Sequence, residues 1–157
     1  MLTLTNYRFE TIALVFSTMG ILVSLFFEFA LESQPCKLCL WQRYLMLAIF
    51  CLSILSIITS FKAIVLLILG SFLALIGVSG YHAMVQFGFV FDPCSVPVVS
   101  SKMEFWKAIN SPIPCSKISA SIFGMPLSVV NAFLSLIVFL YLVKQLSFSV
   151  IDPKKIV

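Results

Sequence analysis

The sequence predicts an all-α membrane protein, an antiparallel bundle of four transmembrane helices with two loops on its outer side. Hydrophobic residues make up 61% of the 157 residues and charged residues only 10%, a composition that suits a lipid-facing exterior and excludes an ordinary soluble domain. Four apolar stretches are long enough to cross a hydrocarbon core of roughly 30 Å. Because the connections between successive spans are short, we expect one antiparallel bundle.

The spans are expected near residues 11–31, 44–60, 63–85 and 126–143, within a single membrane domain over residues 1–157. The first follows Arg8 as the apolar part of a signal peptide would, but it is too long and no small-residue cleavage site comes before Cys36. We therefore expect a retained helix. Only Phe61 and Lys62 separate the second and third spans, which requires a tight hairpin. The loops near residues 32–43 and 86–125 then lie on the same side of the membrane.

Basic residues favour an orientation with both termini in the cytoplasm. The inner segments would carry Arg8, Lys62, Lys144, Lys154 and Lys155, and the outer segments as many basic residues spread over a longer stretch of chain. The density of positive charge near the spans is therefore higher inside. Paired cysteines on the outer side agree with this orientation, because disulfides persist outside the cytosol.

Small residues that permit close helix packing recur on three of the spans. They are Ser17, Gly20 and Ser24 on the first, Ser53 and Ser56 on the second, and Gly70, Ala74 and Gly77 on the third. Asn131 in the fourth span is expected to make an interhelical hydrogen bond. Cys51 is interpreted as a small apolar filler of the second span, and Glu28 as an interfacial carboxylate. In the second loop, Ser101 to Glu104 matches a capping box, so an interfacial helix and a plain covering loop both remain open.

Four cysteines lie in the outer loops, Cys36 and Cys39 as a Cys-x-x-Cys pair and Cys94 and Cys115 far apart in the second loop. A disulfide between Cys36 and Cys39 would enclose almost no chain and add little stability, which indicates a reversible redox pair. A structural zinc site is disfavoured because Cys94 and Cys115 are not a second close pair. An inert disulfide that stabilises the second loop by roughly 3 kcal/mol remains an alternative.

Arg43 follows Cys39 by four residues, on the same face of a helix whose first turn suits Pro35. Burying Arg within a span costs about 2.5 to 3.5 kcal/mol, and less toward the interface. Arg43 is therefore either an anchor at the headgroups or a cation that stabilises the Cys39 thiolate and an anionic electron acceptor beside it.

With these features, the chain resembles the DsbB family of bacterial disulfide bond formation proteins. The resemblance covers nearly the whole chain. It rests on four spans, the outer Cys36-Lys37-Leu38-Cys39 with Arg43 at the head of span two, Tyr81-His82-Ala83-Met84-Val85-Gln86 ending span three, a cysteine on each side of the second loop, and Gly124-Met125-Pro126 opening span four.

The resemblance implies a thiol:quinone oxidoreductase of the bacterial inner membrane that reoxidises a periplasmic, DsbA-like thioredoxin-fold oxidase. Carried over, Cys94 would be attacked by the partner's thiolate, and Cys115 or the partner's second thiol would resolve the mixed disulfide. Electrons would pass to the Cys36–Cys39 pair, with Cys36 communicating with the loop and Cys39, nearest Arg43, facing the quinone. The partners implied are that oxidase, the membrane quinone pool and lipid, with no nucleic acid.

The electron acceptor implied is ubiquinone or menaquinone, and no metal or flavin is expected because a dithiol supplies both electrons. His82, the only histidine, is either a helix-end residue bonded to a neighbouring carbonyl or a hydrogen-bond donor to a quinone oxygen. Gln86, one turn later, would assist it.

Two departures from the family pattern are visible, a seemingly shorter Cys94 to Cys115 loop and Gln42 where an acidic residue can precede the Arg. They leave open whether the partner is a general or a dedicated oxidase. A vitamin K epoxide reductase-like protein is the nearest enzyme alternative, but its cysteine pairs come in the reverse order. A non-catalytic tetraspan assembly protein with structural disulfides is the alternative from another class.

Overall fold

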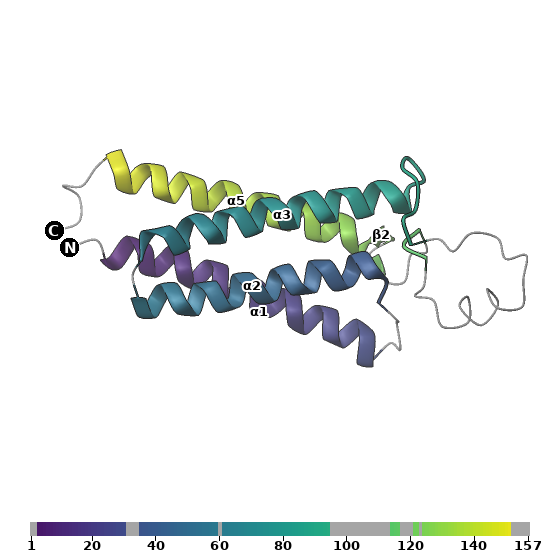
Figure 1. The fold of residues 1–157 in the computed structure, drawn as a ribbon, viewed down its shortest axis with the longest axis horizontal. Coiled ribbons are helices and arrows are strands. Elements are labelled where there is room, and N and C mark those ends of the chain that lie inside the picture. The colour runs from purple at the N-terminus through teal and green to yellow at the C-terminus, as the bar shows by residue number, and fades with distance from the viewer. Residues whose placement is uncertain are drawn as a thin grey trace, which may run out of the picture.

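A computed structural model describes residues 3–30, 35–59, 61–94, 114–116, 121–122 and 124–151. Within these residues the chain forms four long helices, α1 (Thr3–Phe29), α2 (Lys37–Thr59), α3 (Lys62–Gln86) and α5 (Leu127–Ile151). All four contain segments that are long and apolar enough to cross a membrane. They lie side by side along their length (Figure 1). The predicted all-α four-helix membrane bundle is therefore confirmed.

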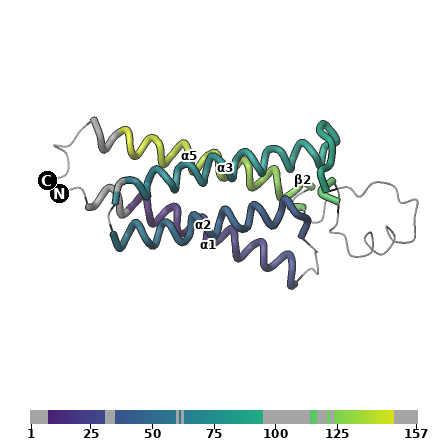
Figure 2. Tube along the Cα trace, viewed as in Figure 1, coloured from purple at the N-terminus to yellow at the C-terminus, as the bar shows by residue number. Residues whose placement is uncertain are grey.

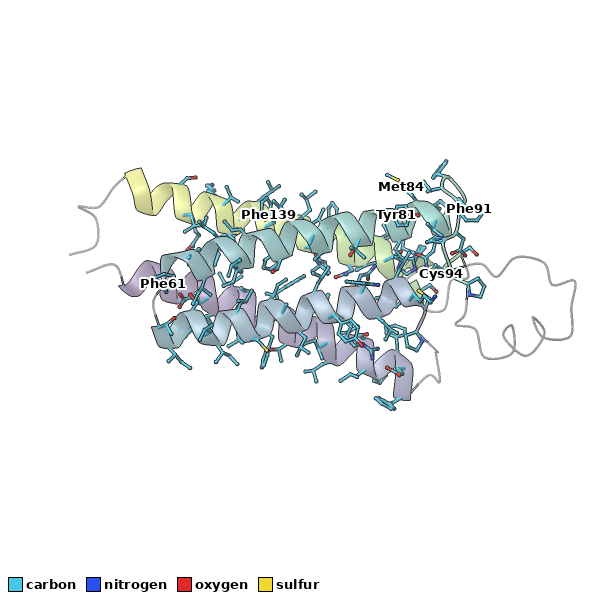
Figure 3. The ribbon with its side chains drawn as sticks, viewed as in Figure 1. Phe61, Tyr81, Met84, Phe91, Cys94 and Phe139 are labelled. Atoms are coloured by element: carbon cyan, nitrogen blue, oxygen red, sulfur yellow. A yellow bond between two sulfur atoms is a disulfide. The ribbon has the colours of Figure 1, made fainter. Side chains whose placement is uncertain are left out.

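The helices pack as a ring in which each contacts the next, α1 on α2, α2 on α3, α3 on α5 and α5 on α1. The start of α1, the end of α2, the start of α3 and the end of α5 share one end of the bundle (Figure 1), which we call the terminal end, and Figure 2 shows the same arrangement of the four helices as a Cα trace. The start of α2 and the end of α3 share the other, which we call the cysteine end. Figure 3 shows Phe61 at the terminal end and Cys94 at the cysteine end.

The helices differ from the expected spans mainly at their ends. α2 begins at Lys37 rather than near Tyr44, so Cys39 and Arg43 lie on the helix and not in a loop. α5 continues to Ile151, past the expected end near Val143. α2 ends at Thr59 and α3 begins at Lys62, which agrees with the expected tight hairpin. The possible interfacial helix near Ser101 lies outside the described residues.

A short antiparallel ladder precedes α5 at the cysteine end. β1 (Ser121–Ile122) pairs with β2 (Met125–Pro126), with Ser121 opposite Pro126. Gly124 in the intervening turn has φ of 79°, a left-handed conformation that glycine adopts without steric cost. The ladder leads directly into α5, since Pro126 at the end of β2 immediately precedes Leu127, the first residue of the helix.

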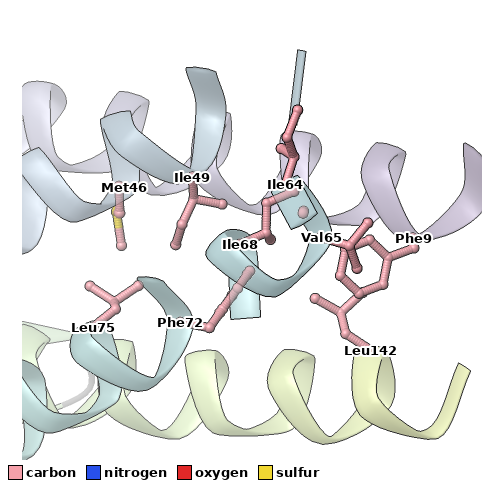
Figure 4. Packing of buried hydrophobic residues seen from close by; sticks show 10 residues of the cluster. Phe9, Met46, Ile49, Ile64, Val65, Ile68, Phe72, Leu75 and Leu142 are labelled. Carbon is pink, nitrogen blue, oxygen red and sulfur yellow. The ribbon is translucent and has the colours of Figure 1, made fainter. Parts of the chain in front are cut away.

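The main core lies in the half of the bundle toward the terminal end and draws on all four helices (Figure 4). Its largest fully buried side chains include Phe9, Ile49, Phe72 and Leu142. Because lipid tails are as apolar as these side chains, the core stabilises the bundle through close packing and not through removal from water. One carboxylate is buried there as well. Glu10 is 4% exposed and accepts a 2.6 Å hydrogen bond from Ser56 Oγ.

The small residues fulfil the packing prediction on two helices and not on the third. Ser17, Ser53 and Ser56 are buried, and a Cβ added at Gly20 would lie 2.5 Å from Met46 Sδ, so the Met46 side chain of α2 packs directly against Gly20 of α1. Gly70, Ala74 and Gly77 instead lie on an exposed face of α3. Cys51 is also exposed on α2. The packing interpretation of Gly70, Ala74 and Gly77 was therefore wrong, and Cys51 does not fill a packed position. Both the packed and the lipid-facing sides of these helices are apolar, so a small residue does not by itself identify the packed side.

Candidate active site

Cys36 and Cys39 meet at the start of α2 with their Sγ atoms 3.0 Å apart. Cys36 is the residue immediately before the helix, and its Sγ accepts the backbone N–H of Cys39 at 3.3 Å. This is the position and contact of an N-cap side chain, here made by sulfur. Both cysteines are free thiols in the structure. The pair is therefore close enough to close a disulfide and open enough to exist as a dithiol.

The donors that surround Cys36 favour its thiolate. The hydrogen bond from the Cys39 thiol makes the largest contribution, burial opposes it, and His82 and the Cys39 N–H add to it, so that the pKa of Cys36 is lowered from 9.0 to about 4. The helix N-terminus acts in the same direction, since its partial positive charge stabilises an anion. Cys36 is thus the thiolate of the pair, and Cys39 its hydrogen-bond donor.

His82 lies behind the pair on α3, where it is 2% exposed. Its Nε2 is 3.6 Å from Cys36 Sγ, and its Nδ1 is 3.1 Å from Gln42 Nε2. Asn131 Nδ2 on α5 donates to Gln42 Oε1 at 3.2 Å and to Ser79 Oγ at 2.9 Å. The interhelical hydrogen bond expected of Asn131 is therefore present, and it belongs to a network that reaches the redox pair.

Arg43 points toward α1 rather than standing alone beside Cys39. Its Nη1 lies 2.6 Å from Glu28 Oε2, and its Nε and Nη2 donate to Ser24 Oγ at 3.1 and 2.9 Å. Both charged side chains are partly exposed. From the sequence, Glu28 was interpreted as an interfacial carboxylate and was not paired with Arg43. The pair could have been predicted from the sequence, because Glu28 lies near the end of the first span and Arg43 near the start of the second, and antiparallel helices bring these two ends together.

A cavity of about 370 Å³ opens between the helices at the cysteine end. Its polar lining includes Cys39, Gln42, Arg43, His82, Gln86 and Asn131, and its apolar lining includes Phe16, Met19, Val23, Phe27, Met46, Leu127, Val130 and Leu134. Gln86 is held there by a hydrogen bond from Ser128 Oγ. The structure thus gathers Cys39 and the three residues predicted to meet a quinone, Arg43, His82 and Gln86, around one apolar space, whereas Cys36 lies outside its lining.

The second cysteine pair is oxidised and touches the first. Cys94 and Cys115 form a disulfide that packs in a small buried cluster with Cys36 and Val85. Cys94 is 7% exposed and Cys115 is fully buried. Because both sulfurs are buried, attack by a partner on this disulfide requires Cys94 to become more exposed.

Asp92 accepts backbone hydrogen bonds from both segments that the disulfide joins. Its two carboxylate oxygens accept the backbone N–H groups of Cys94 and Ser116, each at 2.8 Å. Burial, the largest single influence, raises the pKa of Asp92, but the hydrogen bonds to Cys94 and Ser116 together outweigh it and leave the pKa below its ordinary value. Asp92 is therefore a carboxylate at neutral pH, and it spans the chain on both sides of the disulfide.

The donor atoms of Cys36, Cys39 and His82 lie within 4.8 Å of one another. Two thiolates and an imidazole are a donor set known in zinc sites. A ring nitrogen can bind a metal only when it carries no proton, so the tautomer of His82 decides whether this set can act as a metal site.

Comparison with known proteins identifies the family. The family model for disulfide bond formation protein DsbB matches residues 8–145. Comparisons with curated proteins and with solved structures give no match. The matched range contains both cysteine pairs, the Arg43–Glu28 ion pair and the network around His82. Because it covers most of the chain, and because members of this family generate protein disulfides, the protein is a disulfide-generating oxidoreductase that belongs to the DsbB family.

Proposed function

We propose that this protein oxidises the dithiol of a soluble, DsbA-like thioredoxin-fold protein and passes the two electrons to a membrane quinone. The observation that carries the proposal is the arrangement of the two cysteine pairs in series. The Cys94–Cys115 disulfide packs against Cys36, and Cys39 lines the cavity between the helices. Disulfide exchange needs a thiolate beside a disulfide, and this arrangement supports an electron path from the loop to the cavity.

The exchange steps balance through cysteine chemistry. A thiolate of the reduced partner attacks the Cys94–Cys115 disulfide, and the partner's second thiolate resolves the mixed disulfide. The partner leaves oxidised, and Cys94 and Cys115 are left as thiols. They then reduce a Cys36–Cys39 disulfide by the same exchange.

The cavity suits an apolar ring with two oxygens. A bound quinone would take up two electrons and two protons. The volume of about 370 Å³ is within the usual range of small-molecule sites, roughly 300 to 1,000 Å³. Arg43, oriented by Glu28 and Ser24, would stabilise negative charge on the acceptor. Gln86 would donate to its second oxygen. His82 also lines the cavity, and its ring connects the cavity to Cys36, whose Sγ is 3.6 Å from Nε2.

Quinone reduction by the purified protein tests the proposal. A reduced thioredoxin-fold oxidase and either ubiquinone or menaquinone are supplied, and loss of the quinone absorbance is followed. Cys39→Ser should abolish quinone reduction while the protein stays folded, because the Cys36–Cys39 link closes almost no loop. Cys51→Ser is the matched control, since Cys51 is exposed on the exterior of α2, and it should turn over normally. Wild-type turnover by Cys39→Ser would refute the electron path.

We also propose that the cysteine end faces the periplasm and that both termini lie in the cytoplasm of a bacterium, with the bundle in the inner membrane. Two exposed aromatic residues at opposite ends allow a test. Phe91 is 81% exposed at the cysteine end and Phe61 is 64% exposed at the terminal end (Figure 3). In a background in which Cys36, Cys39 and Cys51 are all replaced by Ser, a membrane-impermeant thiol reagent should label Phe91→Cys in intact cells and Phe61→Cys only after lysis. The reverse pattern would invert the orientation.

A further inference from the structure

The two ring nitrogens of His82 face different chemical groups, and this difference fixes the position of its proton. His82 is 2% exposed, so the nearby side chains and not water are its partners. Nε2 is 3.6 Å from Cys36 Sγ, and Nδ1 is 3.1 Å from the amide nitrogen of Gln42. An amide nitrogen only donates hydrogen bonds. Nδ1 must therefore accept, and a neutral ring carries its proton on Nε2, toward Cys36.

The orientation of the Gln42 amide is itself set by Asn131. Asn131 Nδ2 lies 3.2 Å from Gln42 Oε1 and 2.9 Å from Ser79 Oγ. Both hydrogens of this amide nitrogen are used, one toward each oxygen. Because Gln42 Oε1 is occupied by Asn131, its Nε2 is the end that remains for His82. The chain of hydrogen bonds thus runs from Asn131 on α5 through Gln42 on α2 to His82 on α3, and it ends at the sulfur of Cys36.

We propose that Asn131 and Gln42 are positioning residues that hold His82 as the neutral, Nε2-protonated tautomer, so that His82 donates a hydrogen bond to the sulfur of Cys36. A proton on Nδ1 is disfavoured here, because it would point at the hydrogens of the Gln42 amide. The benefit to dithiol oxidation rests on the function proposed above, whereas the tautomer itself follows from the contacts alone.

The same tautomer closes the potential metal site. The sulfurs of Cys36 and Cys39 and the ring of His82 have their donor atoms within 4.8 Å, the arrangement of a three-ligand Cys₂His zinc centre. With its proton on Nε2, His82 cannot coordinate a metal on the side that faces the sulfurs. Asn131 and Gln42 therefore keep the reduced dithiol available for exchange and reduce its capture by thiophilic metal ions such as Zn²⁺ or Cd²⁺.

The alternative arrangement is chemically complete and must be separated by experiment. If both amides were rotated by half a turn, Ser79 and Gln42 would donate hydrogen bonds to Asn131 Oδ1. Gln42 Oε1 would then accept a hydrogen bond from the Nδ1–H of His82. The bare Nε2 would then face Cys36 and would be a metal ligand. The two arrangements differ in the position of one proton, and nuclear magnetic resonance detects that position directly.

Because His82 is the only histidine, ¹⁵N-histidine labelling of the whole reduced protein in detergent micelles reports on this ring alone. The Nε2 resonance is recognised because it couples to both ring carbon-bound protons. We expect the protonated type of shift on Nε2 and the unprotonated type on Nδ1. A proton on Nδ1, or protons on both nitrogens at neutral pH, would overturn the proposal. The measurement needs neither quinone nor partner, so its failure would leave the proposed oxidoreductase function standing.

Asn131→Asp is the most direct perturbation, since it replaces the donor with an acceptor of the same size. Gln42 should then turn its Nε2 to the new carboxylate and its Oε1 to His82, which moves the ring proton to Nδ1. Ser79→Ala is the matched control, because it removes one bond of Asn131 but keeps the bond to Gln42, and the Nε2 proton should remain. No change in the tautomer of Asn131→Asp, or an equal change in Ser79→Ala, would refute the relay.

Metal binding gives a second measurement. If Asn131 had only a structural role, its substitution would not change the affinity of the dithiol for a metal ion. Cd²⁺ added to the reduced protein is followed by the charge-transfer absorbance of cadmium thiolate. The Asn131→Asp variant should bind Cd²⁺ at least about tenfold more tightly than the wild type. In this variant the Nε2 atom of His82 carries no proton that has to be lost before the metal binds. Equal affinity in wild type, Asn131→Asp and Ser79→Ala would show that the tautomer does not protect the dithiol. If Asn131→Asp does not fold, the tautomer of the wild-type ring still decides the proposal.

Discussion

Titration of Cys36 distinguishes a redox thiolate from an inert buried thiol. The hydrogen bonds to its sulfur lower its pKa from 9.0 to about 4. At pH 7 the thiolate would then exceed the thiol by roughly 1000 to 1, whereas a thiol with a pKa near 9 is only about 1% ionised. Because the pKa of Cys36 is lowered, its thiolate is present above about pH 4. The thiolate is lost as the pH falls through this value.

The rate of alkylation at one pH is a poor measure of this shift. A fall from 9.0 to about 4 raises the thiolate fraction at pH 7 about a hundredfold, but it lowers the intrinsic nucleophilicity by roughly two decades, because the Brønsted coefficient is about 0.4 to 0.5. The two effects nearly cancel. The position of the titration midpoint, and not the reactivity at neutral pH, is therefore the informative quantity.

The assay follows the ultraviolet absorbance of thiolate in the reduced protein between about pH 3 and pH 9, with the spectrum of Cys36→Ser subtracted. We expect a midpoint near pH 4. Cys39→Ala should raise the midpoint more than His82→Ala, since the Cys39 thiol makes the largest contribution to the shift. A wild-type midpoint near pH 9, or the opposite order of the two variants, would refute the assignment of Cys36 as the thiolate.

Three further predictions concern quinone use and the loop. Arg43→Ala should raise the KM for quinone several-fold more than it slows exchange with the partner, and Arg43→Lys should be intermediate because it keeps the charge without the planar fork; unchanged quinone kinetics in both would make Arg43 an anchor. Gly20→Ala should also raise the quinone KM, because its Cβ would lie 2.5 Å from Met46 Sδ and displace that side chain from the cavity wall. An unchanged KM in a variant of normal thermal stability would contradict this role of the cavity. Cys115→Ala should accumulate a mixed disulfide with a partner that lacks its second thiol, seen on non-reducing gels, and an adduct mapped to Cys36 or Cys39 would contradict the proposed order of exchange.

Hydropathy and the short connections between spans were sufficient to predict the fold and the placing of both cysteine pairs on one side of the membrane, whereas communication between the pairs was implied only by the family resemblance. Both signals are local in sequence: a span needs only its own length of apolar residues, and a tight hairpin after Thr59 brings the loops to one side. The second span was expected to begin near Tyr44, whereas α2 begins at Lys37, directly after Cys36, which caps it.

The rotation of each helix about its axis could not be predicted in the same way. In a soluble helix the polar face reveals which side is buried, but here both the packed and the lipid-facing sides are apolar. Gly70 and Gly77 were for this reason assigned to an interface that the structure does not contain among its described residues. The contact between Gln42 and Asn131 depends on two such rotations at once, so neither residue was recognised as part of the site.

The carboxylate of Asp92 joins the two ends of the redox loop without using sulfur. Its bonds to the N–H groups of Cys94 and Ser116 do not require the disulfide, so we expect them to hold Cys94 near Cys115 after the disulfide has opened. The two thiols would then keep a high effective concentration toward each other, and Cys115 would rapidly expel any partner that lacks a fast second thiol. Asp92→Asn should lengthen the lifetime of adducts with a monothiol such as glutathione, measured by rapid acid quenching, more than it changes oxidation of a dithiol partner. Asp92 would in this way select substrates kinetically. Dithiol proteins complete the exchange with their second thiol, whereas small monothiols are released unchanged when Cys115 attacks the mixed disulfide.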